Sequence, residues 1–458
     1  EYDNAGNMIT SIDGNGNKTV YEYDIKGQLI KKIDAEGNEE KYTYDAVGNL
    51  ITHVDGEGGK KQYKYDGVGQ IISETDATGN TYAYKYNSTG VIVEETNPLG
   101  QVTKQETDAV GNIVARILPN GAEYNYSYDL LGRVTDIKAP EGMEKHYEYD
   151  EIGNMVLEYD QSGRKVKYTY DKQHRLISIQ NPTGEKTTYN YDKTGNLKSV
   201  ITPLGAATSY SYDKLDRVLS ETNADGLKTE LSYDEIGNVV KVTENSIRET
   251  KYTYDNVGNE TSITDAIGQV EKYKYTKTGE IESIVDAMGQ TVTYSYNKNK
   301  RVKSYTKVDG SKVEYSYDKN NNLIKLIDEE NNVTDYTYDK LNRLVGVDNG
   351  INSTYYQYDE ISNLATRTDG NGNSTSYTYD MAGRVQTITN PLGDIQKFSY
   401  DLDGRIEKVT EQSGDTIKYD YNELDKLTDI SYSQDNMSNV AYGYDKDGHR
   451  ISMKDMTG

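Results

Sequence analysis

Carboxylates are the most abundant side chains in this sequence that could do acid–base chemistry. The 458 residues include 75 Asp and Glu against 51 Lys and Arg, which gives a formal net charge of −24. A glycosidase, for example, needs two carboxyls in one cleft with separated pKa values. Here the Asp residues recur at fixed phases of a repeated motif, so every copy would qualify equally. The pattern therefore predicts no catalytic residue and a protein that is not an enzyme.

Two short segments carry the alternating oxygen ligands of the first half of a calcium loop. Residues 13–17 and 369–373 both read DGNGN. Asp13, Asn15, Asp369 and Asn371 are weak calcium candidates, because no bidentate Glu closes either loop at the right spacing. A tight turn needs Asp and Asn at this phase in any case. We therefore interpret both segments as turns, with adventitious calcium binding as the alternative, and we expect no cofactor.

Histidine and cysteine offer no other metal or nucleophile site. The chain contains no Cys, which excludes disulfide frameworks, thiolate metal sites and thiol catalysis. No Ser or Thr lies in a nucleophile elbow, and no phosphate-binding glycine loop occurs. The four histidines fall at different phases of the repeat and share no metal-ligand spacing; they are His53, His146, His174 and His449.

Tyrosine, usually followed by Asp, recurs along the chain with a fixed period. The motif begins at Tyr2 and returns every 21 residues up to Tyr338. The phase slips near residues 346–353 and 433–440, and Thr107 is the one exception to Tyr among 22 repeat phases. No change in composition interrupts the series. The sequence therefore predicts one uninterrupted repeat array over residues 1–458, which begins in the middle of a motif and looks like a fragment of a longer protein.

Each repeat contains two turn motifs. The first turn follows the repeat Tyr, as in YDAVGN at residues 44–49. The second turn begins about eleven residues after each repeat Tyr, as in DAEGN at residues 34–38. Asp bonds its own backbone two residues on, and Gly adopts positive φ without strain. The Gly position of the first turn holds Gly in 15 of the 22 phases and Asn, Asp or His in five more. Lys300 and Ser362 do not fit this preference.

Between the turns the sequence alternates with a period of two. Tyr42 and Tyr44 fall on one face of a strand, and the other strand of each repeat opens with an aliphatic pair such as Leu29 and Ile30. No stretch shows a sustained helical period. An open twisted sheet rarely exceeds about ten strands, so about 44 strands must curl. We predict an all-β repeat protein whose antiparallel strand pairs of about 21 residues wind into a continuous spiral β-shell or hollow tube.

Composition also limits the partners. The excess of negative charge repels phosphate backbones and argues against nucleic acid. No run of apolar residues approaches the length of a membrane span.

The repeats resemble the YD-repeat, or Rhs-repeat, family. Members of that family include bacterial Rhs and wall-associated polymorphic toxins, the shell components of Tc toxins, and teneurins. The resemblance covers essentially the whole chain, with two turn motifs in each repeat. The residues that carry it include Tyr23, Asp24, Gly27, Tyr44, Asp45, Gly48, Tyr254, Asp255, Gly258, Tyr379, Asp380 and Gly383.

The resemblance implies a structural, non-enzymatic, extracellular β-shell in a larger bacterial surface or secreted protein. In the toxins of the family such a shell holds a C-terminal toxic domain until delivery, so the expected partners are adjoining segments of the same polypeptide. The alternative is a cell-surface adhesive stalk or a carbohydrate-binding tube that contacts cell-wall glycans through its Tyr rows. On either interpretation we expect the protein to be secreted or at the cell surface.

Overall fold

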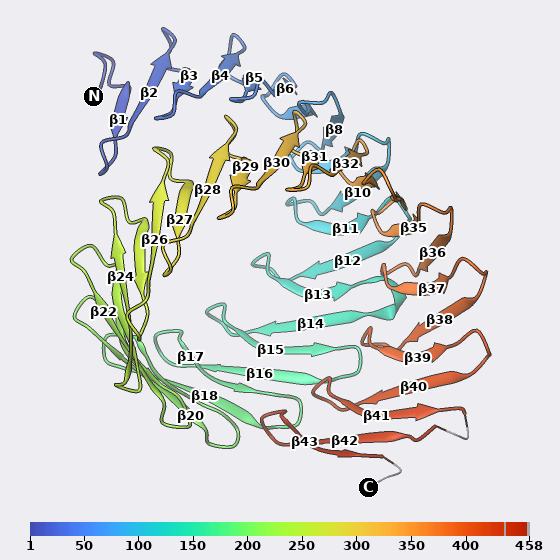
Figure 1. Cartoon of the computed structure of the whole chain (residues 1–458). Coiled ribbons are helices and arrows are strands. Elements are labelled where there is room, and N and C mark those ends of the chain that lie inside the picture. Colours follow the sequence, from blue (N-terminus) through green and yellow to red (C-terminus); the bar gives the residue numbers. More distant parts are fainter. Residues whose placement is uncertain (435–436, 456–458) are drawn as a thin grey trace. The chain divides into compact units, whose positions relative to one another are not determined.

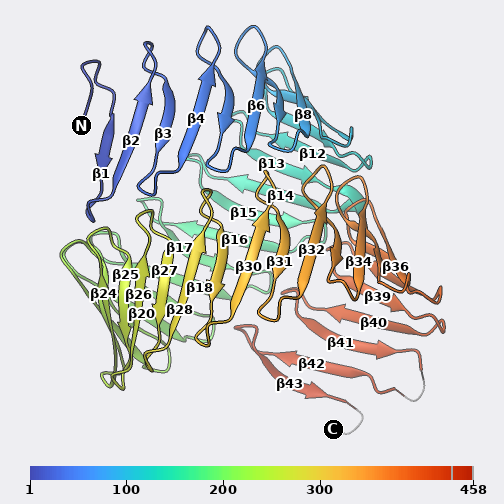
Figure 2. The same cartoon turned by 45° about the horizontal axis from the view of Figure 1, so that its top comes forward.

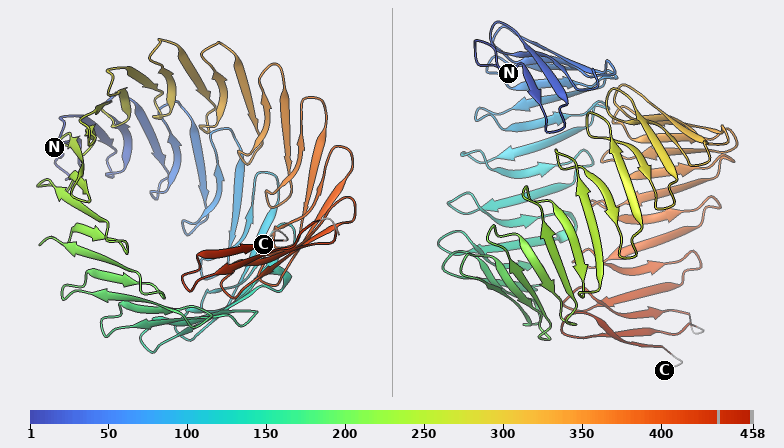
Figure 3. Two further views of the ribbon diagram at one scale, coloured as in Figure 1. Left: turned by 60° about the horizontal axis from the view of Figure 1, so that its bottom comes forward. Right: turned by 60° about the vertical axis from the view of Figure 1, so that its left-hand side comes forward.

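The structure is a computed structural model, and it describes residues 1–434 and 437–455. Within these residues the chain forms 43 β-strands and one short 3-10 helix, η1 (Pro140–Gly142). The strands belong to one sheet, in which each strand pairs antiparallel with the next one along the chain. The run of hairpins can be followed from blue to red in Figure 3. The prediction of an all-β protein built from antiparallel strand pairs is confirmed.

The strands are short and nearly uniform in length. The first half comprises β1 (Thr10–Ile12), β2 (Lys18–Tyr23), β3 (Leu29–Ile33), β4 (Glu39–Tyr44), β5 (Leu50–Val54), β6 (Lys60–Tyr65), β7 (Ile71–Thr75), β8 (Thr81–Tyr86), β9 (Ile92–Thr96), β10 (Val102–Thr107), β11 (Ile113–Ile117), β12 (Glu123–Tyr128), β13 (Val134–Lys138), β14 (Glu144–Tyr149), β15 (Met155–Asp160), β16 (Lys165–Tyr170), β17 (Leu176–Gln180), β18 (Lys186–Tyr191), β19 (Leu197–Ile201), β20 (Ala207–Tyr212), β21 (Val218–Thr222) and β22 (Lys228–Tyr233).

The second half continues the same alternation. It comprises β23 (Val239–Glu244), β24 (Arg248–Tyr254), β25 (Glu260–Thr264), β26 (Val270–Tyr275), β27 (Ile281–Val285), β28 (Thr291–Tyr296), β29 (Val302–Thr306), β30 (Lys312–Tyr317), β31 (Leu323–Ile327), β32 (Val333–Tyr338), β33 (Leu344–Asp348), β34 (Ser353–Tyr358), β35 (Leu364–Thr368), β36 (Ser374–Tyr379), β37 (Val385–Thr389), β38 (Ile395–Tyr400), β39 (Ile406–Thr410), β40 (Thr416–Tyr421), β41 (Leu427–Tyr432), β42 (Val440–Tyr444) and β43 (Arg450–Lys454).

The two faces of the sheet differ in exposure. In β8 the side chains of Tyr82, Tyr84 and Tyr86 are half-buried, whereas those of Thr81 and Lys85 on the opposite face are exposed. Most of the strands that end in the repeat Tyr show the same alternation. The half-buried face is therefore the tyrosine face, as the period of two predicts.

The sheet has almost no fully buried core. The only buried hydrophobic residues among those described are Ala115, Ala122, Val313 and Val409. The accessible surface is 26,988 Å², whereas a compact protein of 51.5 kDa exposes about 17,000 Å². The sheet is therefore a wall one layer thick over most of its length, and half-buried Tyr and aliphatic side chains provide its apolar contacts.

Contacts within the chain group the residues into two compact units, each built from two separate segments. Unit 1 contains Glu1–Val102 and Thr229–Tyr355, and unit 2 contains Thr103–Lys228 and Tyr356–Gly458. Within unit 1, β2 to β8 lie beside β26 to β32 (Figures 1 and 2). The prediction that residues 1–458 form one uninterrupted array from a longer protein remains a prediction.

The first phase slip is absorbed in one shortened turn. In an ordinary second turn the first N–H bonds the carbonyl four residues on, as Asp328 does with Asn332 at 3.0 Å. Between β33 and β34 the N–H of Asn349 bonds the carbonyl of Asn352 at 3.2 Å, which is one residue sooner. Strand pairing on both sides is preserved. The second slip, near residues 433–440, lies partly outside the described residues.

Candidate functional site

The YD motif builds the first turn through its Asp and its Gly. In the turn after Tyr23, Oδ1 of Asp24 accepts N–H bonds from Lys26 and Gln28 at 2.8 and 2.9 Å, and Gly27 has φ +79°. The turns after Tyr44, Tyr254 and Tyr379 repeat this arrangement. Of the signature residues chosen from the sequence, the Asp and Gly residues thus lie in turns, where the carboxylates bond the local backbone, whereas Tyr23, Tyr44, Tyr254 and Tyr379 each end the strand before the turn.

Hydrogen bonding keeps the carboxylate of Asp45 ionised. The backbone and side-chain amides of Asn49 both donate to Asp45, at 2.9 Å each. The backbone bond from Asn49 is the largest influence on the pKa of Asp45 and lowers it, although burial opposes the shift. The ionised carboxylate of Asp45 is therefore held in the turn by these hydrogen bonds.

The turn conformation overrides residue preference at the two positions that do not fit the pattern. Lys300 and Ser362 occupy the Gly position, and both adopt positive φ, at 61° and 74°. A left-handed conformation costs a residue with a Cβ about 1–2 kcal/mol. The hydrogen bonds of the turn and the flanking strand pairs therefore determine the conformation at both positions.

The hydroxyl of the repeat Tyr bonds a backbone carbonyl one repeat upstream. Tyr65 donates to Leu50 O at 2.8 Å, and the same bond, usually to the residue 15 positions earlier, recurs along the chain at 2.6 to 3.0 Å. The pairing of β5 with β6 ends at Thr52↔Gln62, two residues short of Leu50. The Tyr65 hydroxyl therefore supplies a bond to a carbonyl that the strand ladder does not reach.

A register shift in the preceding strand pair accompanies this bond. Between β4 and β5 the partners change from Thr43↔Thr52 to Tyr44↔Leu50, so Ile51 is left without a partner. Such a bulge interrupts the ladder and locally increases the strand twist. The same shift occurs at the repeat Tyr of the next strand pairs along the chain.

Tyr65→Phe should lower the free energy of unfolding by about 1–2 kcal/mol, because the Leu50 carbonyl loses its donor. Tyr63 is the matched control: it lies two residues earlier on the same face of β6, and its hydroxyl makes no hydrogen bond among the described residues. Tyr63→Phe should change stability little. Urea unfolding with unchanged m-values checks the pair, and equal shifts in the two midpoints would contradict the role given to the repeat Tyr.

The weak calcium candidates lie in second turns and bond the protein itself. Oδ1 of Asp13 accepts N–H bonds from Asn15 and Asn17 at 2.9 and 2.8 Å, and Oδ1 of Asp369 likewise accepts from Asn371. The side chain of Asn15 extends away from this turn and bonds Asp255. In the part of the chain that the structure describes, no group of three or more His, Asp or Glu side chains could hold a metal ion. Both segments form turns, and adventitious calcium binding stays the untested alternative.

The candidate functional feature of unit 1 is a seam at which second turns meet first turns. Asn15 accepts the N–H of Asn256 at 3.1 Å, and Glu36 accepts the N–H of Lys277 at 2.9 Å. Glu57 repeats the contact with Lys298. In each pair the acceptor is the side chain of the third residue of a second turn. The donor is the backbone N–H of the residue two positions after a repeat Tyr. The seam therefore uses the same two positions in successive repeats.

Close backbone approach at this seam explains two glycines. A Cβ added to Gly14 would lie 2.4 Å from the carbonyl oxygen of Asn256, and one added to Gly56 would lie 2.7 Å from that of Lys298. These distances leave no room for a larger side chain unless the backbone shifts. Glycine at these positions thus allows the two segments to approach, which is separate from its usual role at positive φ.

Unit 2 contains a corresponding seam, with a second turn at residues 160–164 and a first turn at residues 401–405. Gln161 donates to Asp403 at 2.6 Å, and Ser162 donates to the same carboxylate at 2.9 Å. Further along, Asp447 accepts a hydrogen bond from Thr202 at 2.6 Å and one from the N–H of Leu204 at 3.0 Å. Partners across the seams lie 239 to 261 residues apart.

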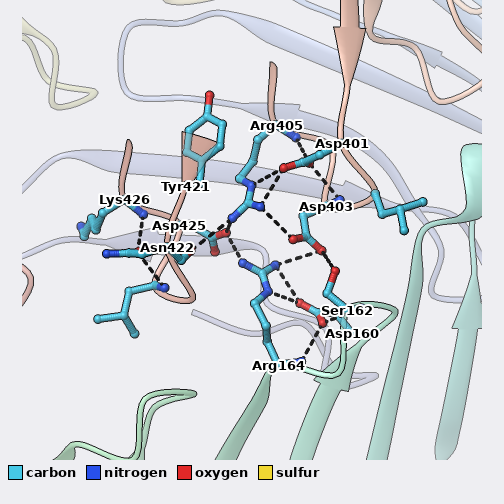
Figure 4. Close-up of polar contacts among 12 residues, drawn as sticks. Asp160, Ser162, Arg164, Asp401, Asp403, Arg405, Tyr421, Asn422, Asp425 and Lys426 are labelled. Atoms are coloured by element: carbon cyan, nitrogen blue, oxygen red, sulfur yellow. Dashed lines mark hydrogen bonds and ion pairs between the residues drawn. The ribbon is translucent and has the colours of Figure 1, made fainter. Parts of the chain in front are cut away.

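Two arginines complete an ionic network at the seam of unit 2. Figure 4 shows the guanidinium groups of Arg164 and Arg405 facing the carboxylates of Asp403 and Asp425. Asp403 lies 3.2 Å from Arg164 and 3.1 Å from Arg405, and Asp425 contacts both arginines. Arg405 also stacks over the ring of Tyr421, at 4.6 Å from its centroid. The network joins three turns from two segments of the chain.

Burial gives this network its strength. The Asp403 side chain is 6% exposed and that of Asp160 is 5% exposed. Burial opposes ionisation of Asp160, but hydrogen bonds from Arg164 outweigh it and leave the pKa of Asp160 below its ordinary value. Removing one partner from such a buried network costs much more than breaking an exposed ion pair, because a buried charge is left without compensation.

Sequence reasoning did not find these seam residues. Arg164, Asp403 and Asp425 belong to turns that look like any other turn of the array. One sequence feature could have indicated the seam: the third residue of the second turn is Glu at positions 36, 57 and 141. Each of these carboxylates accepts a backbone N–H from a first turn. That signal identifies one side of the seam and leaves its partner unknown.

No helix in the described residues is long and apolar enough to cross a membrane.

Comparisons with known proteins agree with this repeat architecture. The family model described as Teneurin YD-shell matches residues 108–220, 208–328 and 324–458, and the RHS Repeat model matches residues 2–39, 26–60 and 65–102. A search of curated proteins found no match.

Several solved structures share the fold. The crystal structure of TcdB2-TccC3-Cdc42 matches with a TM-score of 0.68 at 15% identity, over 97% of this chain and 29% of that chain. The crystal structure of TcdB2-TccC3 without its hypervariable C-terminal region gives 0.66 at 13%, over 97% and 31%. The Photorhabdus luminescens Tc holotoxin pore with a mutated TccC3 gives 0.57 at 16%, over 97% and 29%. The chain thus spans about 30% of the length of these structures.

The repeated turns, the hydroxyl bonds and the continuous sheet all occur in a chain that the family models match along nearly its whole length. The chain belongs to the Rhs/YD-repeat family, with a teneurin YD-shell over residues 108–458.

Proposed function

We propose that this chain is a structural, non-enzymatic β-shell of a larger bacterial surface or secreted protein, and that it encapsulates or presents a cargo domain. The partner would be an adjoining segment of the same polypeptide, including a C-terminal toxin domain. The expectation comes from the family, and the fold shared with Tc toxin chains supports it. Winding of the sheet around an enclosed space is part of the proposal, as is an extracellular or surface location.

The observation that carries the proposal is the pair of seams. A confining wall must be closed along its turn edges as well as within its strands. In each unit, segments about 240 residues apart are bonded turn to turn, through Glu57 and Lys298 in unit 1 and through Ser162 and Asp403 in unit 2. These contacts hold the edges of the sheet together. The wall is thereby suited to exclude proteases from whatever lies behind it.

The repeated side chains support a structural role. The YD carboxylates bond the turns, and the repeat Tyr hydroxyls bond backbone carbonyls. Side chains whose polar atoms already bond the protein backbone are poorly suited to bind glycans. We therefore favour the shell over the adhesive stalk or carbohydrate-binding tube. The net charge of −24 also suits a large soluble surface.

Protease protection tests the proposal. The longer polypeptide that contains this array is digested under native conditions, and cleavage of the segment C-terminal to residue 458 is followed by mass spectrometry. Confinement predicts cleavage about tenfold slower, or more, than for the same segment produced alone, because the protease must wait for the wall to open. Asp403→Ala, which removes the carboxylate that accepts from Gln161 and Ser162 across the seam of unit 2, should speed this cleavage. Equal rates with and without the array would refute confinement.

A further inference from the structure

We propose that Tyr294, Tyr305 and Tyr315 form a site of oxidative cross-linking, at which a one-electron oxidant joins two of the rings as dityrosine. The three residues lie in unit 1, on β28, β29 and β30. The chain has 45 Tyr but no Trp and no Cys, the other side chains that readily give up a single electron. Its 8 Met take up an oxygen atom instead and become sulfoxides. The composition therefore directs one-electron oxidation to tyrosine.

Tyr305 departs from the repeat pattern. It stands directly opposite Tyr294 in the ladder that joins β28 to β29. The equivalent position in the repeats on either side is aliphatic and holds Ile284 and Leu326. The Cβ atoms of directly opposite residues lie about 4.5–5.5 Å apart. The rings of Tyr294 and Tyr305 thus project from adjacent points on the same face of the sheet.

The three rings contact one another in sequence. The ring centroids of Tyr294 and Tyr305 are 6.0 Å apart, with an interplanar angle of 34°. Those of Tyr305 and Tyr315 are 6.4 Å apart, with an angle of 28°. Tyr315 lies two residues beyond Val313, which is the register partner of Tyr305 on β30. Tyr305 therefore has one tyrosine ring beside it on each neighbouring strand.

The hydroxyls of these three residues are not engaged in the backbone bonds that hold the repeat Tyr. Among the described residues none of the three hydroxyls makes a hydrogen bond, and the three side chains are half-buried. In contrast, the repeat Tyr of the same strand β28, Tyr296, donates to Ile281 O at 2.7 Å. A ring without such a bond can rotate about its side-chain torsions, and its hydroxyl can release a proton to water when the ring is oxidised. The cluster therefore combines ring contact with freedom to react.

The coupling removes two electrons and two protons from a pair of rings. With hydrogen peroxide as the oxidant and a haem peroxidase as its catalyst, each phenol loses one electron and its hydroxyl proton. The two radicals form a carbon–carbon bond between ring carbons adjacent to the oxygens. Each of these carbons then gives up its hydrogen as a proton, and each oxygen regains one. One hydrogen peroxide is reduced to two waters for each bond formed, and the bond joins neighbouring strands covalently.

Oxidation of the full chain with a haem peroxidase and a limited amount of hydrogen peroxide tests the proposal. Dityrosine fluorescence measures the product, and mass spectrometry of a digest identifies peptides joined with the loss of two hydrogen atoms. We expect the main cross-link to join Tyr305 to Tyr294 or Tyr315, at a yield independent of protein concentration. Tyr305→Phe should lower the total intramolecular dityrosine at least about tenfold, because it removes the ring held beside both others. Its circular dichroism spectrum should be unchanged, because the lost hydroxyl has no partner.

Tyr84→Phe is the matched control. Tyr84 occupies the same place on β8 as Tyr294 on β28 and is also half-buried, but its register partner is Glu95. This variant should form as much dityrosine as the unaltered protein does. Cross-links spread evenly over many tyrosines, cross-links only between molecules, an equal loss in the two variants, or no dityrosine at all would overturn the proposal.

Discussion

Asp403→Ala should destabilise unit 2 by about 3 kcal/mol, because it removes a buried carboxylate on which two arginines converge. Arg164 and Arg405 lie 3.2 and 3.1 Å from this carboxylate, and Gln161 and Ser162 donate to it as well. Asp160 and Asp401 still pair with Arg164 and Arg405, but Gln161 and Ser162 each lose an acceptor, and Asp425, the other carboxylate that contacts both arginines, is 59% exposed. Urea unfolding monitored by circular dichroism measures the change.

Asp225→Ala provides the control for this variant. Asp225 is an exposed turn residue, and its carboxylate makes no contact among those found in the described residues. Its replacement should change the free energy of unfolding by less than about 0.5 kcal/mol. If both variants unfold at the same urea concentration, the seam of unit 2 contributes no measurable stability and its network is only a surface feature.

Raising the pH should unfold the protein cooperatively between about pH 10 and pH 12. Burial, followed by the charge of Glu158, raises the pKa of Tyr168 from 10.0 to about 12. The pKa values of Tyr84 and Tyr273 also rise to about 12, with burial as the first cause. A raised folded pKa stabilises the fold fully below the unfolded value of 10, and this stabilisation is lost as the pH rises through 12.

The size of this effect comes from repetition. The chain has 45 Tyr, many of them on the half-buried face, so small contributions accumulate in one pH window. Absorbance at 295 nm should report ionisation together with the loss of β-sheet circular dichroism, whereas the urea-unfolded chain should titrate near pH 10. Ionisation of all tyrosines near pH 10 with an intact sheet signal would contradict the burial described for the tyrosine face.

The fold could be predicted because its determinants are local. Asp24 and Gly27 fix a turn through bonds and backbone angles within five residues, and a period of two in Tyr42 and Tyr44 fixes a strand face. These features recur in every repeat. Local sequence is therefore enough to determine which strands pair along the chain. Even Lys300, which has no preference for the left-handed region, follows the turn that its neighbours impose.

The seams could not be predicted because their register is not local. Arg164 meets Asp403 only because the sheet brings together segments about 240 residues apart, and that separation depends on the twist and curvature of many strand pairs. No residue type marks the partner in advance. The role of the Tyr65 hydroxyl was hidden for a related reason, since it depends on a bulge that a strict alternation does not reveal.

Hydrogen–deuterium exchange over the whole chain tests most directly the claim that all the repeats form one continuous hydrogen-bonded sheet. The account predicts slow exchange in consecutive strands from β2 to β41, with fast exchange restricted to exposed turn amides. Several adjacent repeats that exchange at the rate of an unfolded chain, between protected regions on either side, would contradict it.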